Sequence, residues 1–148
     1  MSASPLARVL EKAACSCQEL ETPSPGFACL LEVEADELVA LVRIVSRNGF
    51  FIESISAVDR PKEKAMEGVY IFNQYEESQR LLIRVRLDRG RPVLPSIVKI
   101  FPGALWYERE LAEMFGIRFD GCPDTRNLLL PEEATYHPLR KDFKGVKR

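Results

Sequence analysis

Two neighbouring segments in the middle of the chain constrain its fold most strongly. From Leu81 to Asp88, apolar residues alternate with more polar ones, as in a strand with one buried and one wet face. Residues 70–75 read as a second strand, and residues 76–79 between the two predict a hairpin turn. Because so short a link joins antiparallel neighbours, we expect a largely antiparallel sheet.

Helical periodicity appears in three other segments. Apolar residues recur at helical spacing from Pro5 to Leu20 and again from residue 36 to the Asn48-Gly49 pair, which predicts two helices. A third helix is expected over Ala104–Phe115, because Gly116 is a natural C-terminal stop.

The remaining strands complete the fold class. They are expected at residues 27–33, 50–58 and 117–119, and the charged stretch that begins at Asp59 reads as an exposed connection. The order helix, strand, helix, three strands, helix predicts an α+β fold, in which helices pack on a largely antiparallel sheet.

The length and the C-terminal composition predict one domain with an arm. A chain of 148 residues fits a single α+β domain, which we assign to residues 1–130. Residues 131–148 carry few core-forming side chains, so we expect an extended basic arm that is mobile alone and ordered on a partner. From His137 onward its bases are Arg140, Lys141, Lys144, Lys147 and Arg148, against the single acid Asp142.

Composition excludes several classes of function. The longest apolar stretch, residues 38–45, is interrupted by Arg43 and falls far short of the roughly 20 residues that span a bilayer. The N-terminus has no secretion-signal pattern, so we expect a cytoplasmic location. Nucleic acid is disfavoured as a partner, because the body of the chain is not basic.

The cysteines do not form a metal-binding pattern. Cys15, Cys17, Cys29 and Cys122 include no C-x2-C pair, and His137 is the only histidine. We therefore expect buried thiols and no metal or redox cofactor in this chain.

Polar side chains concentrate in three clusters. The first lies on the third predicted helix, the second in a turn at residues 119–126, and the third at residues 136–143. Glu110 and Glu113 could form a carboxylate pair for a small hydrolase, or the helix could carry an ion-pair network that faces a partner. No nucleophile, nearby histidine or phosphate-binding loop accompanies the two glutamates, which favours the second interpretation.

The amino-acid sequence of these clusters resembles that of a known family. The run WYERELAEMFGIRFDGCPDTRNLLLPEE, followed by HPLRKDF, closely resembles the 30 kDa subunit, or C subunit, of bacterial respiratory NADH dehydrogenase, complex I. It also resembles the equivalent subunit of membrane-bound energy-converting nickel–iron hydrogenases. The resemblance extends backward through PSIVKIFPGALW, EGVY and ISAVD, and covers about residues 36 to 143.

The resemblance implies a cofactor-free structural or assembly subunit in the cytoplasmic peripheral arm of a membrane-bound NADH:quinone oxidoreductase. Its expected partners are the large subunit that frames the quinone site, or its nickel–iron counterpart, and an iron–sulfur subunit. It would meet the membrane only through the complex, peripherally on the cytoplasmic side. The hydrogenase subunit is the alternative, and the small hydrolase ranks below it.

The resemblance also assigns a set of subunit-interface residues. They are Trp106, Glu108, Arg109, Glu110, Glu113, Asp124, Arg126, His137, Arg140, Lys141 and Asp142. We expect Arg109 to matter most on its helix, because a planar guanidinium can bind a partner carboxylate with two hydrogen bonds. Cys122 departs from the complex I pattern, where a histidine is common.

Overall fold

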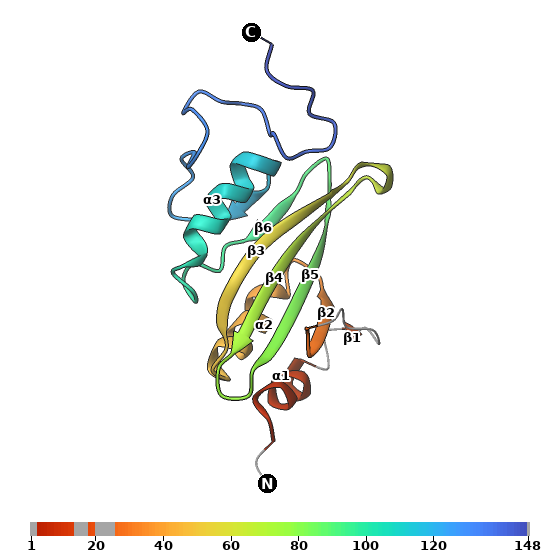
Figure 1. Cartoon of the computed structure of the whole chain (residues 1–148), viewed down its shortest axis with the longest axis vertical. Coiled ribbons are helices and arrows are strands. Elements are labelled where there is room, and N and C mark those ends of the chain that lie inside the picture. The colour runs from red at the N-terminus through yellow and green to blue at the C-terminus, as the bar shows by residue number, and fades with distance from the viewer. Residues whose placement is uncertain (1–2, 14–17, 20–25, 148) are drawn as a thin grey trace.

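A five-stranded sheet forms the body of the protein in the computed structural model, which describes residues 3–13, 18–19 and 26–147 (Figure 1). The strand order is β1-β2-β5-β4-β3. The strands are β1 (Gln18–Glu19), β2 (Cys29–Val33), β3 (Phe51–Arg60), β4 (Ala65–Gln74) and β5 (Gln79–Asp88).

The sheet is mixed but mainly antiparallel. Strands β3, β4 and β5 follow one another as antiparallel neighbours, as their short links predict. Strand β2 pairs with β5 in parallel, with Glu32 opposite Arg84. The predicted α+β class is therefore confirmed, with one parallel pair that the local pattern does not reveal.

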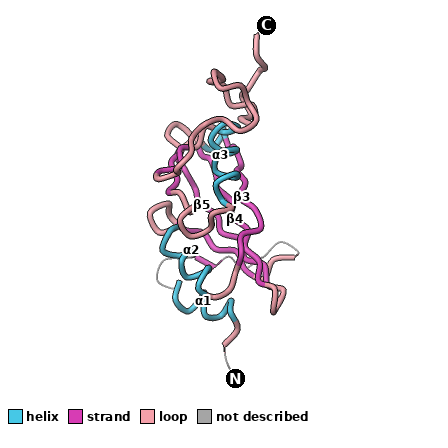
Figure 2. Tube along the Cα trace, turned by 90° about the vertical axis from the view of Figure 1, so that its left-hand side faces the viewer, coloured by secondary structure: helices cyan, strands magenta, loops and turns pink. Residues whose placement is uncertain are grey.

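Three α-helices accompany the sheet. Figure 2 shows α1 (Pro5–Ala13) and α2 (Leu38–Arg47) together at the N-terminal end, and α3 (Ala104–Phe115) towards the other end. Leu38, Val42 and Val45 of α2 are fully buried in one apolar core with the central strands, because they recur on one helix face. A short 3-10 helix, η1 (Pro61–Glu63), joins β3 to β4.

A small second sheet positions α3. Strand β6 (Val93–Pro95) pairs in parallel with β7 (Arg118–Asp120), and these strands lie on either side of α3 in the sequence. Helix α3 contacts β3 and β7. The helix is thus packed against strands of both sheets.

Two predicted boundaries were wrong. The first helix ends at Ala13, and Gln18–Glu19 form a strand because they pair with Glu32 and Leu31. Residues 14–17 and 20–25 lie outside the described residues, and with them the predictions about Cys15 and Cys17.

The charged stretch after Val58 is exposed only in part: Lys62, Glu63 and Lys64 are exposed as predicted, whereas Asp59 is buried. Strand β3 runs on to Arg60, and β4 begins at Ala65, so the hairpin is longer than predicted. Its acids Asp59 and Glu67 are buried, because the guanidinium of Arg89 pairs with Asp59 and that of Arg60 pairs with Glu67.

Residues 121–147 contain no helix or strand and run past α3 to the end of the molecule (Figure 1). Within the described ranges, no helix is long and apolar enough to cross a membrane.

Candidate interaction site around helix α3

Helix α3 has the bounds that its sequence predicts. Ala104, Leu111 and Phe115 are buried, and Gly116 ends the helix with a φ of +74°, where an L side chain would be strained. The Tyr107 hydroxyl donates to the Glu53 carbonyl at 3.0 Å, which ties the helix to β3.

Glu108 faces the interior of its own domain and is fully buried. Its carboxylate accepts hydrogen bonds from the Ser96 hydroxyl at 2.7 Å and from the Ile97 backbone N–H at 2.8 Å. Burial raises the pKa of Glu108, because it disfavours the charged form. The expectation that Glu108 lies at a subunit interface is therefore corrected.

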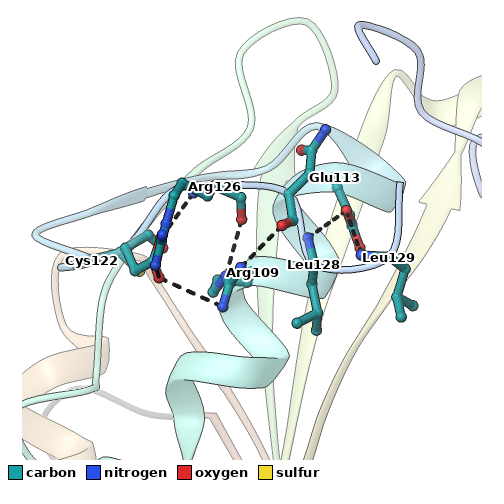
Figure 3. A network of polar contacts seen from close by, with 8 residues as sticks. Arg109, Glu113, Cys122, Arg126, Leu128 and Leu129 are labelled. Carbon is teal, nitrogen blue, oxygen red and sulfur yellow. Dashed lines mark hydrogen bonds and ion pairs between the residues drawn. The ribbon is translucent and has the colours of Figure 1, made fainter. Parts of the chain in front are cut away.

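Arg109 uses its forked geometry within the chain. Its Nε donates to the carbonyl of Arg126 and its Nη2 to that of Asn127, both at 3.0 Å (Figure 3). Its Nη1 lies 3.6 Å from the carboxylate of Asp124. The fork was expected to meet a partner's carboxylate, but backbone carbonyls of residues 126 and 127 occupy it.

Glu113 holds the same segment from one turn further along the helix. Its two oxygens accept hydrogen bonds from the backbone N–H groups of Leu128 and Leu129 at 2.9 to 3.1 Å (Figure 3). The Leu130 N–H donates to the same carboxylate at 3.1 Å. The residue is only 4% exposed. Because its oxygens are engaged and buried, Glu113 is not available as the second carboxylate of a hydrolase with the half-buried Glu110.

A second segment caps the C-terminal end of α3. The last carbonyls of a helix lack partners within it. Here His137 Nδ1 donates to the carbonyl of Glu113 at 2.9 Å, the Leu139 N–H to that of Met114 at 3.1 Å, and Arg140 Nε to that of Phe115 at 2.6 Å. The Arg140 cation also lies at the negative end of the helix dipole.

Gly116 makes this cap possible. A Cβ at this position would lie 2.7 Å from His137 Nε2 and 2.8 Å from Arg140 Nη2. Any other residue at this position would therefore clash with the His137 and Arg140 side chains. We refer to Arg109, Glu113, His137 and Arg140, with the segments 124–130 and 137–140 that they hold, as the α3 clasp.

The next two residues fasten the chain to the main sheet. The Lys141 backbone N–H donates to Asp59 at 2.8 Å, and the Asp142 carboxylate lies 3.0 Å from Nη2 of Arg89. Arg89 also makes two hydrogen bonds to Asp59, which lower the pKa of that carboxyl. The expectation of a mobile arm is therefore revised for residues 137–142.

A second arginine, Arg126, shapes the turn at the start of the clasp. Asp124 accepts hydrogen bonds from Nε and Nη2 of Arg126, at 3.0 and 2.8 Å, which hold the pKa of Asp124 well below its usual range. The Cys122 thiol donates to the Asp124 carbonyl at 3.2 Å, and burial raises its pKa. Cys122 therefore stays a protonated thiol, as its surroundings predict.

The expected interface residues thus separate by exposure. Glu108 and Glu113 are buried; Arg109, Glu110, Asp124, His137 and Arg140 are half-buried; Trp106, Arg126, Lys141 and Asp142 are exposed. Trp106 is 57% exposed and lies on the same side of α3 as Arg109, whose guanidinium carbon is 5.4 Å from its ring centre.

Sequence reasoning missed Asp59 and Arg89 as members of this network. They are 30 residues apart in the chain, and no local pattern joins them. The available signal was Asp59 itself, which ends the ISAVD run of the resemblance.

The fold and the site define a class of protein: an α+β domain in which the conspicuous polar residues of the α3 clasp bind the backbone of their own chain. Among the described residues, no group of three or more His, Cys, Asp or Glu side chains could hold a metal ion.

The chain belongs to the family of the respiratory-chain NADH dehydrogenase 30 kDa subunit, whose family model matches residues 31–148. It is 37% identical over 116 residues to the NADH-quinone oxidoreductase C subunit of Moorella thermoacetica, covering 77% of this chain and 78% of that one. It is 39% identical over 93 residues to the F(420)H(2) dehydrogenase C subunit of Methanosarcina mazei, covering 62% and 59%. The chain spans only 54% of the NADH-quinone oxidoreductase C subunit of Chelativorans sp., over 73% of its own length at 38% identity.

Two solved structures share the fold. One is a chain of the membrane-bound sulfane sulfur reductase, an archaeal respiratory membrane complex, with a TM-score of 0.80 and 28% identity over 93% of this chain and 82% of that one. The other is a trypsin-resistant fragment of Nqo5, with a TM-score of 0.69 and 25% identity over 81% and 98%.

Proposed function

We propose that this chain is a cofactor-free structural subunit in the cytoplasmic peripheral arm of a membrane-bound NADH:quinone oxidoreductase. It packs against the large subunit that frames the quinone site and against an iron–sulfur subunit, and meets the membrane only through the complex. The observation that carries the proposal is the α3 clasp: Arg109 and Glu113 act on this chain's own backbone, in a domain whose relatives are named as subunits of respiratory complexes.

The clasp supports a docking role because its segments carry exposed apolar side chains. Leu129 is 65% exposed and Leu139 is 53% exposed, although their backbone N–H groups are bonded to adjacent residues of α3, Glu113 and Met114. Trp106 is exposed two turns earlier on the same helix. Large apolar side chains on rigid backbone are typical of protein–protein interfaces.

The test uses a tagged copy of the chain in its native host, purified from solubilised membranes. We expect the quinone-site and iron–sulfur subunits to co-purify with NADH:quinone activity. The chain purified alone should show no flavin or iron–sulfur absorption and no NADH oxidation. A chain that is recovered without partner subunits, or that retains a chromophore at stoichiometry, contradicts the proposal.

Two matched variants test the docking surface. Leu129→Asp should reduce the recovery of partner subunits, because it places a charge in an apolar contact. Tyr75→Asp alters a side chain that is 80% exposed at the β4–β5 turn, and should leave recovery unchanged. The melting temperature of each isolated variant must stay near that of the wild type for the comparison to hold.

The equivalent subunit of an energy-converting nickel–iron hydrogenase is a second candidate. The observation behind it is that the relatives include a chain of the membrane-bound sulfane sulfur reductase and the F(420)H(2) dehydrogenase C subunit, so the family is not confined to NADH dehydrogenases. Metal analysis of the purified complex separates the two: stoichiometric nickel supports the hydrogenase, whereas flavin with NADH-dependent quinone reduction supports the NADH dehydrogenase.

A further inference from the structure

We infer that the hollow between the β3–β4 hairpin and the C-terminal segment is an anion-binding pocket, which receives a carboxylate side chain from a neighbouring protein subunit. The inference rests on the proposed function, because it requires a partner within a complex. It concerns a surface apart from Trp106 and Leu129.

Three separate parts of the chain build this pocket. It has a volume of about 330 Å³ and is lined by Pro61, Lys64, Asp88, Arg89, Gly90 and Arg140. The Arg89 N–H donates to the Lys64 carbonyl at 3.1 Å, which joins the end of β5 to the hairpin. The bond from the Lys141 N–H to Asp59 brings the C-terminal segment to the same place. Three cations therefore surround one hollow that contains a single acid, Asp88.

Hydrogen bonds and ion pairs hold Arg89 and Arg140 in position, and each arginine keeps N–H donors that these contacts do not use. Arg89 uses Nε and Nη2 on Asp59 and Asp142, and Arg140 uses Nε on the Phe115 carbonyl. No described residue accepts a hydrogen bond from Arg89 Nη1, from the terminal nitrogens of Arg140, or from Lys64 Nζ. Fixed guanidinium groups with spare N–H donors match a carboxylate, and little side-chain entropy is lost when it binds.

The shape and the surrounding charges favour a protein side chain over a membrane surface. The cations line a shallow, open hollow, while Asp142 is exposed beside it. A flat anionic bilayer would meet that acid together with the bases, whereas a single aspartate or glutamate enters between the cations. Lys62 and Lys144 are exposed on neighbouring segments, and their charge would steer an acidic segment towards the pocket.

Carbodiimide coupling of the intact complex tests the contact directly. A water-soluble carbodiimide joins a lysine amine to a carboxylate only where the two touch. We expect mass spectrometry to find Lys64 linked to an aspartate or glutamate of another subunit. Lys99, an exposed lysine outside the pocket, should show no such link. Lys64 coupled only to its own chain, or left uncoupled, overturns the inference.

Charge variants at the same position give an independent measurement. Lys64→Glu should lower the affinity of the chain for the complex about tenfold, so the complex should release the chain at a lower salt concentration. Lys64→Gln should have a smaller effect. Lys64 has a φ of +50°. Glutamate and glutamine fit that backbone conformation about as well as lysine does, so the melting temperature of the isolated chain should not change. Lys99→Glu is the control for charge reversal elsewhere.

The outcomes separate this inference from the proposed function. If the wild-type chain co-purifies with no complex, the proposed function fails. If it co-purifies and Lys64→Glu is retained at the same salt concentration, only the pocket inference fails. Binding of the isolated chain to phosphatidylglycerol vesicles that Lys64→Glu abolishes, with retention in the complex unchanged, assigns the pocket to lipid and overturns the inference.

Discussion

Arg109 shows how a side chain of the motif can act on the backbone of its own chain. Its guanidinium spans two backbone carbonyls, which a single ammonium cannot do in the same geometry. Arg109→Lys should therefore lower the free energy of unfolding of the isolated chain by about 1 to 2 kcal/mol. Chemical denaturation measures the change.

Arg126→Lys is the matched control for this prediction, because the Arg126 side chain is 79% exposed. It should cost only a few tenths of a kcal/mol, since exposed ion pairs contribute little. Equal effects of the two variants would contradict the role given to the Arg109 fork.

Asp59 gives the protein a defined response to acid. Its hydrogen bonds from Arg89 lower the pKa of the carboxyl in the folded state. The stability that this shift contributes is complete above the unfolded pKa, about 3.9, and is lost as the pH falls through the folded pKa.

We therefore expect Asp59→Asn to remove part of the acid sensitivity of the chain. At neutral pH the variant should be less stable by about 3 kcal/mol, because Arg89 loses a buried partner. Below pH 4 the difference from the wild type should shrink. Unfolding curves between pH 3 and 7 measure it, and a difference that is constant across this range would refute the assignment.

At the scale of the element, α3 shows what a sequence reveals and what it does not. Its bounds, Ala104 and Phe115, follow from apolar periodicity and from the glycine after it, which are local signals. The partners of Arg109 and Arg140 lie 17 to 25 residues away, and no periodicity relates them. The clustered polar residues could be predicted as a site, but their contacts with this chain's own backbone could not.

The cap on α3 makes a prediction for Gly116. Gly116→Ala strains a positive φ and drives a Cβ into His137 and Arg140, so it should destabilise the chain by about 3 kcal/mol or more. Gly121→Ala isolates the backbone cost, because Gly121 has a φ of +85° but no atom within 4 Å of its Cβ position. It should cost about 1 kcal/mol. Thermal unfolding of the two variants should differ clearly, and similar losses would show that the contact with the cap is unimportant.

At the scale of the whole molecule, the C-terminal segment belongs to the fold. Sequence composition predicts an arm without a core of its own, and in that respect residues 131–147 do lack helix and strand. Composition does not reveal that backbone carbonyls of α3 and the buried Asp59 depend on residues 137–142. The sheet was similarly predictable where strands are adjacent in sequence, whereas the parallel pairing of β2 with β5 was not.

Truncation tests this integration. A chain that ends at Leu130 loses the caps of α3 and the contacts with Asp59 and Arg89, so its melting temperature should fall by about 10 °C. A chain that ends at Phe143 keeps all of these contacts and should melt close to the full chain. An unchanged melting temperature for the shorter chain would restore the interpretation of a mobile arm.

The parallel pair in the sheet also sets the order in which the chain can fold. Strands β3, β4 and β5 are joined by short links and can form as a meander from contacts that are close in sequence. Pairing β2 with β5 brings Glu32 and Arg84 together across 52 positions of sequence, and closing so long a loop costs entropy before any contact is gained. We therefore expect β2 (Cys29–Val33) to dock on a β4–β5 hairpin that has already formed, and β1, which pairs with the outer side of β2, to join no earlier.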